Sequence, residues 1–252
     1  MCINKIVEKD EVIGVLLLAI DNTEKIQAEQ NRREFTANVS HELKTPLQSI
    51  IGSADLIESG LVKPEDMPRF IGHIKTDAAR LVSLVSDIIR LSQLDENTEM
   101  NWENVDALSV AKEALEMVDP IAESRNISLT IKGEPAPLNS VHKLLYDIIY
   151  NLCDNAVKYN KEGGFVKVDV KTTGDKVQVA VSDNGVGIAP ADQSRVFERF
   201  YRVDKSHSRE SGGTGLGLSI VKHAVAYLKG SISLESTLGK GTTITVSFPA
   251  EK

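Results

Sequence analysis

Two long amphipathic segments constrain the fold of this chain most strongly. Apolar residues spaced alternately by four and three positions indicate helices that pack through a heptad seam. The sequence "GLVKPED" separates them, with a glycine to end one helix and a proline suited to the start of the next. The first seam is Leu43, Leu47, Ile50, Ala54, Ile57 and Leu61, and the second is Ile71, Ile74, Ala78, Leu81, Val85 and Ile88.

These segments predict an all-α helical hairpin over residues 22–98. Two helices cannot bury a continuous seam by themselves, so we expect two chains to pair as a dimeric four-helix bundle. The stretch "LDENTEMN" ends the second helix and is the candidate hinge between the hairpin and the rest of the chain.

The pattern of apolar residues changes after about residue 102. Short β-branched runs such as "FVKVDV" and "TTITVSF" alternate with helical patterns near residues 107–124, 139–159 and 214–228. This alternation predicts an α/β sandwich with a mixed sheet over residues 99–252.

Composition excludes several classes of protein. The formal net charge of −7 argues against a general nucleic-acid binder, which needs a basic face. Cys2 and Cys153 are the two cysteines of the chain, so we expect a reducing compartment and no disulfide framework.

The longest apolar run, "VIGVLLLAI" at residues 12–20, is about half of the roughly 20 residues that a membrane-spanning helix needs. We interpret it as a buried strand. We expect residues 1–21 to be the end of another domain whose remainder lies outside this chain.

His41 lies in the stretch "NVSHELKTPLQS", one residue away from the seam of the first helix. Its imidazole should therefore face solvent, together with Thr45. Glu42 can act as base and orienter for an imidazole nucleophile. Pro46 removes the hydrogen bond to the carbonyl of Glu42, which predicts a weakened, kinked helix at the histidine. A plain solvated polar face is the alternative interpretation.

A second group of polar residues lies in "NLCDNAVKYN". Asn151, Asn155, Lys158 and Tyr159 share one broad face of a helix. Carboxamide oxygens suit Mg²⁺, Lys158 suits a phosphate, and Tyr159 could lie against a base. The alternative is a polar helix end near solvent.

Two glycine-containing motifs come later in the chain. "VQVAVSDNGVGI" places Asp183 at a strand end before Gly185 and Gly187, where its carboxylate can accept from the exocyclic amine of adenine. "GGTGLGLSIVKH" opens a helix, and glycine-rich backbone at a helix start can bind phosphate. We interpret the segment between them, with its arginines and aromatic residues, as a mobile lid.

Five motifs together resemble those of sensor histidine kinases of two-component systems. "SHELKTP" resembles the phosphoacceptor box, "NLCDNAVKY" the asparagine box, "DNGVGI" and "GGTGLGLSIVK" the two glycine boxes, and "FERFYRVD" the phenylalanine box. They occur in the family's order, and the resemblance extends over about residues 22–249. The phosphate-response kind, in which a PAS-like sensor feeds directly into the kinase core, is the most similar.

The resemblance implies a role for each of these residues. His41 would be phosphorylated, Glu42 would be its general base, Thr45 would orient water during dephosphorylation of the partner, and Arg202 would approach the γ-phosphate. Mg²⁺ would be bound by Asn155 with help from Asn151. ATP would be bound by Asn151, Asn155, Lys158, Tyr159, Asp183, Gly185, Gly187, Gly213, Gly215 and Gly217.

The resemblance also implies partners and a location. A response regulator would receive the phosphoryl group on an aspartate, a second copy of the chain would complete the bundle, and no nucleic acid would be involved. The fragment would be cytoplasmic, with the longer protein anchored in the cell membrane through segments absent from this chain. Two alternatives stay open: an ATPase akin to gyrase, chaperone or mismatch-repair types, and a silent pseudokinase that signals by docking.

Overall fold

A computed structural model describes residues 2–8, 11–18, 21–95, 99–203 and 213–250 of the chain. At the N-terminus, β1 (Cys2–Glu8) and β2 (Glu11–Leu18) pair as an antiparallel hairpin. The apolar run that begins at Val12 is therefore a strand, as predicted, up to Leu18. No helix of the described residues is long and apolar enough to cross a membrane.

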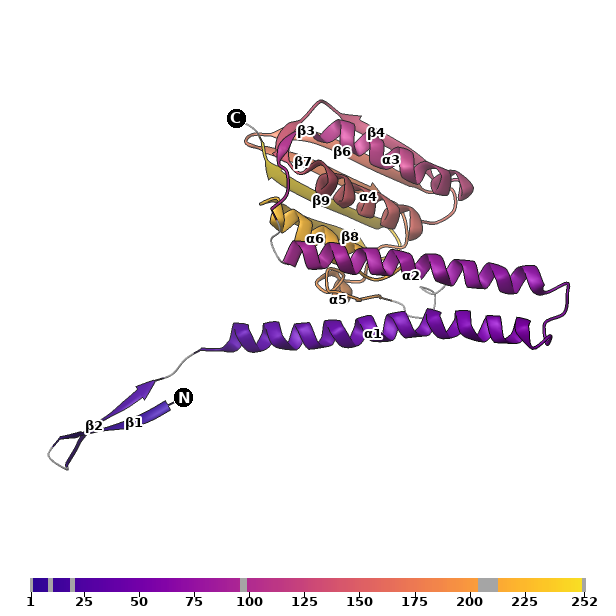
Figure 1. Cartoon of the computed structure of the whole chain (residues 1–252). Coiled ribbons are helices and arrows are strands. Elements are labelled where there is room, and N and C mark those ends of the chain that lie inside the picture. Colours follow the sequence, from indigo (N-terminus) through magenta and orange to yellow (C-terminus); the bar gives the residue numbers. More distant parts are fainter. Residues whose placement is uncertain (1, 9–10, 19–20, 96–98, 204–212, 251–252) are drawn as a thin grey trace.

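The predicted helical hairpin is confirmed. α1 (Thr23–Glu58) and α2 (Met67–Asp95) run antiparallel and pack along most of their length (Figure 1). α1 continues through Pro46, whose side chain is buried, so the proline does not end the helix.

The buried residues of α2 are not those of the predicted seam. Leu84, Leu91 and Leu94 are 2%, 0% and 6% exposed, whereas Ile71 and Val85 of the seam are 55% and 44% exposed in the single chain. The three leucines belong to the same buried cluster as the core of the second domain. α2 therefore packs on the second domain as well as on α1, and the heptad pattern did not predict the contact with the second domain.

The second domain is a sandwich of a mixed five-stranded sheet and three helices, as predicted. The strand order is β4-β6-β7-β9-β8, with β4 parallel to β6 and the other pairs antiparallel. These strands are β4 (Ser128–Gly133), β6 (Phe165–Thr173), β7 (Lys176–Asp183), β8 (Ser231–Thr237) and β9 (Gly241–Pro249).

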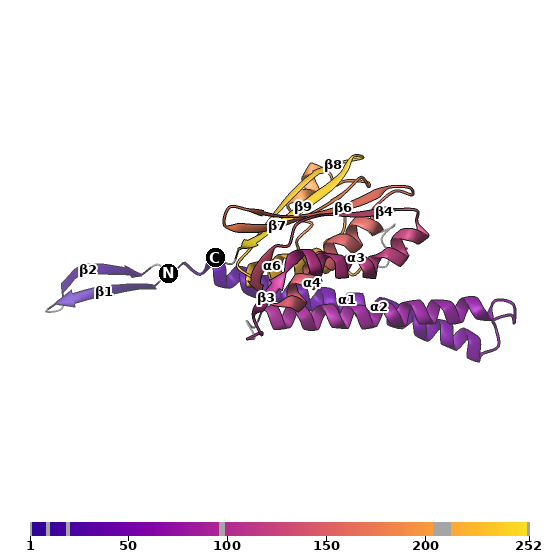
Figure 2. The same ribbon diagram turned by 90° about the horizontal axis from the view of Figure 1, so that it is seen from above.

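Three helices cover the face of this sheet that looks toward the hairpin (Figure 2). They are α3 (Ala107–Ser124), α4 (His142–Lys158) and α6 (Gly217–Tyr227). Alternate valines of the central strands point into this layer, and Val168 of β6 pairs with Val181 of β7, both at most 3% exposed. The period-two pattern thus sets which sheet face forms the core.

The sequence prediction lacked β1 and three shorter elements. β3 (Glu103–Asp106) and β5 (Pro137–Ser140) pair as a separate two-stranded sheet, and α5 (Pro190–Gln193) is a single turn. The Asp106 side chain accepts from the backbone N–H groups of Leu108 and Ser109 and so caps α3.

Candidate functional site

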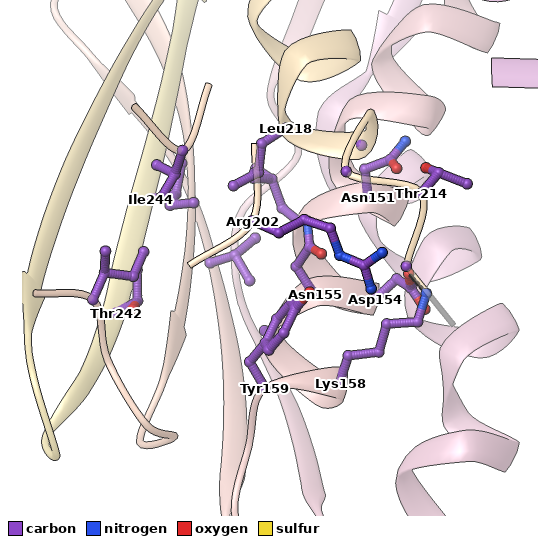
Figure 3. A pocket seen from close by; sticks show the side chains of 18 of the residues that line it. Asn151, Asp154, Asn155, Lys158, Tyr159, Arg202, Thr214, Leu218, Thr242 and Ile244 are labelled. Carbon is purple, nitrogen blue, oxygen red and sulfur yellow. Dashed lines mark hydrogen bonds and ion pairs between the residues drawn. The ribbon is translucent and has the colours of Figure 1, made fainter. Parts of the chain in front are cut away.

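A cavity of about 800 Å³ opens between the second domain and α2. Its size is that of a small-molecule or cofactor site. Figure 3 shows Thr242 and Ile244 on one side, Thr214, Asp154 and Lys158 on the opposite side, and Arg202 between them. The predicted residues that line it are Asn151, Asn155, Lys158, Tyr159, Asp183, Gly187, Arg202, Gly213, Gly215 and Gly217.

The sheet side of the cavity centres on Asp183, the last residue of β7. Its Oδ1 accepts from the backbone N–H groups of Gly185 at 2.8 Å and Thr242 at 3.3 Å. Burial raises the pKa of the Asp183 carboxyl, and those two hydrogen bonds oppose the shift. The result is a fixed acceptor in a half-buried, largely apolar corner beside Ile244.

The glycines after Asp183 are required by close packing. A Cβ on Gly187, which has φ +66°, would lie 2.1 Å from the carbonyl oxygen of Thr237. A Cβ on Gly185 would lie 2.3 Å from the carbonyl oxygen of Tyr159. Gly185 thus packs against the end of α4 and holds the wall of the cavity in place.

The polar side of the cavity is built by one face of α4. Asn151 donates from Nδ2 to the carbonyl oxygen of Asp147 at 2.7 Å, which leaves its Oδ1 directed at the start of α6. A Cβ on Gly217 would lie 2.9 Å from that Oδ1. Lys158 forms an ion pair with Asp154 at 2.7 Å.

Arg125 fixes the end of α4. Its guanidinium donates to the carbonyl oxygens of Lys158 and Asn160, each at 2.9 Å, and to that of Val157. Lys158 is the last residue of α4 and Asn160 lies just beyond it, so the arginine caps the turn that carries Lys158 and Tyr159.

The donor set of this cavity fits Mg-ATP. Carboxamide oxygens on α4, a lysine, and the glycine-rich start of α6 supply groups for a metal and a phosphate chain. The carboxylate of Asp183 is an acceptor of the kind that an adenine amine would need. Cys153 is 1% exposed, and burial raises its pKa to about 12, so this thiol stays protonated and takes no part as a ligand.

The histidine segment lies on α1. His41 and Thr45 are exposed, as predicted, and the Thr45 hydroxyl donates to the carbonyl oxygen of His41 at 3.2 Å. Glu42 is half-buried, and its Oε2 accepts from Arg80 of α2 at 3.2 Å. An arginine of α2 that the sequence did not indicate therefore binds the carboxylate of the residue that follows the histidine.

The two groups of residues meet along α2. Arg80 contacts Glu42, and Ser83, which lies three residues or about 4.5 Å further along the helix axis, lines the cavity. Ser86, Asp87 and Arg90 continue this wall. The sequence placed no residue of α2 in the nucleotide site.

The structure describes only part of the segment that we interpret as a lid. Phe200 of the lid packs against Phe35 of α1 with ring centroids 5.7 Å apart. Tyr201 donates to Asp192 at 2.5 Å, and Arg195 lies over its ring. The predicted mobile portion falls mostly on residues 204–212, which lie outside the described residues.

Two protein-family models match this chain. The His Kinase A (phospho-acceptor) domain family matches residues 31–97, and the Histidine kinase-, DNA gyrase B-, and HSP90-like ATPase family matches residues 140–252. The sensor-like histidine kinase SenX3 of Mycolicibacterium smegmatis is 39% identical over 231 residues, which are 91% of this chain and 60% of that protein. The chain belongs to the sensor histidine kinases.

Other members of the family are also similar. The sensor histidine kinase WalK of Bacillus subtilis is 34% identical over 96% of this chain and 40% of its own length. The chain thus spans about 40% to 60% of the length of these curated relatives. Full-length ShkA, solved in complex with AMPPNP, is 28% identical, with a TM-score of 0.66 over 87% of this chain and 46% of that chain. The Acinetobacter baumannii histidine kinase AdeS shares the fold, with a TM-score of 0.70 at 23% identity, over 84% of this chain and 98% of that chain.

Proposed function

We propose that this chain is the kinase core of a sensor histidine kinase, which transfers the γ-phosphoryl group of ATP to His41. The observation that carries the proposal is the arrangement along α2. The same helix binds Glu42, the residue that follows the exposed histidine, through Arg80, and its next turns line a nucleotide-sized cavity.

His41 is the nucleophile. One ring nitrogen of the neutral imidazole forms a bond to the γ-phosphorus, and the bond to the β–γ bridging oxygen breaks to release ADP. Glu42 takes or shares the proton of the other nitrogen, and Arg80 orients its carboxylate. Thr45, one turn along the exposed face, orients a water when the same core dephosphorylates its partner.

The cavity residues bind and position the nucleotide. Asp183 accepts from the adenine amine, Tyr159 lies against the base, and Gly185 and Gly187 shape that corner. Lys158 and Arg202 bind phosphate oxygens, and Gly213, Gly215 and Gly217 let the backbone approach them. Asn155, with Asn151, would hold Mg²⁺, which neutralises charge on the phosphate chain when bound. The similar histidine kinase ShkA was solved in complex with AMPPNP, which supports a nucleotide as the ligand of this cavity.

The partners are inferred from the same core. A response regulator would receive the phosphoryl group on an aspartate, and a second copy of the chain would complete the four-helix bundle. We divide the chain into a PAS-like end at 1–21, the hairpin at 22–98 and the ATP-binding domain at 99–252. The cytoplasmic location and the membrane anchor of the longer protein stay predictions.

The proposal is tested by incubating the chain with Mg²⁺ and ATP labelled at the γ-phosphate. Wild type should become labelled, His41→Gln should not, and His73→Gln, which changes an exposed histidine on α2, should be labelled like wild type. Asn155→Ala should lower the labelling rate on the order of 100-fold. ATP turnover without labelling, unaffected by His41→Gln, would instead identify an ATPase.

A further inference from the structure

The face of α2 that packs on the ATP-binding domain carries polar contacts besides its leucines. Asp87 accepts from the hydroxyl of Thr214 at 2.8 Å. Arg90 pairs with the buried Asp147 of α4 at 3.1 Å. Asp95, at the end of α2, pairs with Arg199 at 2.8 Å. The hairpin is thus docked on the domain through a built interface.

Asp87 is the contact that reaches the nucleotide site. It lines the cavity, and its partner Thr214 stands between Gly213 and Gly215 in the phosphate-binding loop. The charged groups of Arg90, Lys158 and Asp154 also act on its carboxyl, and burial raises its pKa. Thr214 lies across the cavity from Thr242 and Ile244 (Figure 3). Through its hydrogen bond with Thr214, a carboxylate from the hairpin therefore reaches the side of the cavity that we assign to the phosphates.

Two physical effects act on a nucleotide that enters this docked arrangement. Asp87 already uses the Thr214 hydroxyl, a donor that a phosphate oxygen could take. Its negative charge also repels a triphosphate, and the repulsion is stronger in a half-buried site than in water. Adenosine has no phosphate, so it would meet neither effect.

We propose that Asp87 makes the affinity of the site depend on the phosphate chain, so that binding of ATP and docking of the hairpin on the domain oppose each other. The inference rests on the proposed function and adds a residue from the hairpin to the nucleotide site. Because coupling between two equilibria is reciprocal, ATP weakens docking by the same factor by which docking weakens ATP. The domain that has taken up ATP is then released to reach a histidine.

The test measures binding of AMPPNP, ADP and adenosine, each with Mg²⁺, to the full chain by calorimetry. Asp87→Asn and Asp87→Ser remove the charge, and Asp87→Glu retains it. Asp77→Asn makes the same charge change elsewhere on α2. We expect the two neutral variants to bind AMPPNP about tenfold more tightly, which corresponds to about 1.4 kcal/mol. In these neutral variants the affinity for ADP should rise less, and the affinity for adenosine should not change. Asp87→Glu and Asp77→Asn should bind all three ligands like wild type.

Other patterns overturn the inference. If the neutral variants bound AMPPNP, ADP and adenosine more tightly by the same factor, or no more tightly at all, Asp87 would not make affinity depend on the phosphate chain. Weaker AMPPNP binding in the neutral variants would mean that the carboxylate helps to hold the metal or the loop. Failure of wild type to bind AMPPNP at all would instead contradict the proposed function, so the two failures are distinguishable.

Discussion

Asp183 combines a cost in stability with the role in nucleotide binding that we propose for it. Its carboxyl is desolvated at the end of β7, so the protein favours its protonated form and its pKa rises. Two backbone N–H groups offset part of that cost and fix its orientation. A ligand amine would supply a further donor to the ionised form.

The substitution Asp183→Asn should therefore separate stability from binding. The raised pKa means that the carboxyl stabilises the fold fully below the ordinary aspartate pKa of about 3.9, and that this contribution is lost as pH rises through the folded pKa. We expect Asp183→Asn to be more stable than wild type toward urea at pH 7, with the difference vanishing near about pH 3. AMPPNP should bind about tenfold more weakly, because a charge-assisted hydrogen bond becomes a neutral one.

The exposed Asp175→Asn, in the turn between β6 and β7, is the matched control and should change neither quantity. A variant that is less stable than wild type at pH 7 would show that the ionised carboxylate stabilises the fold, contrary to this account.

The residues of the site differ in how well the sequence predicted them. Asn151, Asn155 and Lys158 recur on one face of a helix, and Asp183 stands at a strand end before glycines, so each has a local signal. Asp154 lies on the same face of α4 but was missed. An acid four positions before a lysine on a helix is usually interpreted as a surface ion pair. Arg80 was missed because its contact with Glu42 crosses from one helix to another.

Among the elements, α2 makes contacts that the sequence did not indicate, because it packs on the ATP-binding domain and lines the cavity. Heptad spacing predicts helices well, and both helices of the hairpin were found. The same spacing cannot tell which apolar stripe faces α1, which faces a second chain and which faces another domain. Leu84, Leu91 and Leu94 were overlooked for this reason. β3 and β5 were missed because four residues carry too little periodicity.

The ion pair between Arg90 and Asp147 tests whether α2 truly packs on α4. Asp147 is 3% exposed, and burial raises its pKa despite the guanidinium. Removal of the cation leaves a buried carboxyl without its partner, so Arg90→Met should lower the free energy of unfolding by about 2 kcal/mol. The double variant Arg90→Met with Asp147→Leu should recover most of this loss, because it removes both charges.

Urea unfolding of the full chain measures both variants. Lys63→Met breaks the exposed pair with Glu65 and serves as the control, with an expected cost below about 1 kcal/mol. If Arg90→Met proved no more costly than this control, the contact between hairpin and domain would not form in solution.

At the scale of the molecule, the hairpin leaves an apolar stripe uncovered in the single chain. Its large hydrophobic residues are 44% to 68% exposed, and within each helix they are spaced by three or four positions. A stripe of this kind on two packed helices is the surface that a second hairpin covers in a four-helix bundle. The stripe includes Leu47 and Ile51 on α1 and Val82, Val85 and Ile89 on α2.

We therefore expect the chain to be a dimer at micromolar concentration, as measured by sedimentation equilibrium. The paired substitution Ile51→Glu with Val82→Glu should produce monomers, because it places four carboxylates in the buried seam of the dimer. AMPPNP binding should persist in these monomers, since one chain forms the whole cavity. Met117→Glu with Leu238→Glu changes exposed apolar residues of the ATP-binding domain and should leave the dimer intact.

The joint arrangement of hairpin and domain could not be predicted from the sequence. The motifs indicated two sites on two domains and a motion between them, because each motif is a local pattern. The docking of α2 against the cavity depends on contacts between residues far apart in the chain, such as Asp87 with Thr214. Such pairs have no signature in either segment alone.

The most direct test of the central claim is to locate the phosphoryl group after the full chain has reacted with Mg-ATP. Mass spectrometry of peptides prepared at alkaline pH should place one phosphoryl group on the peptide that contains His41, and brief acid treatment should remove it. Phosphate on a serine or threonine that survives acid, or on a different histidine, would contradict the account.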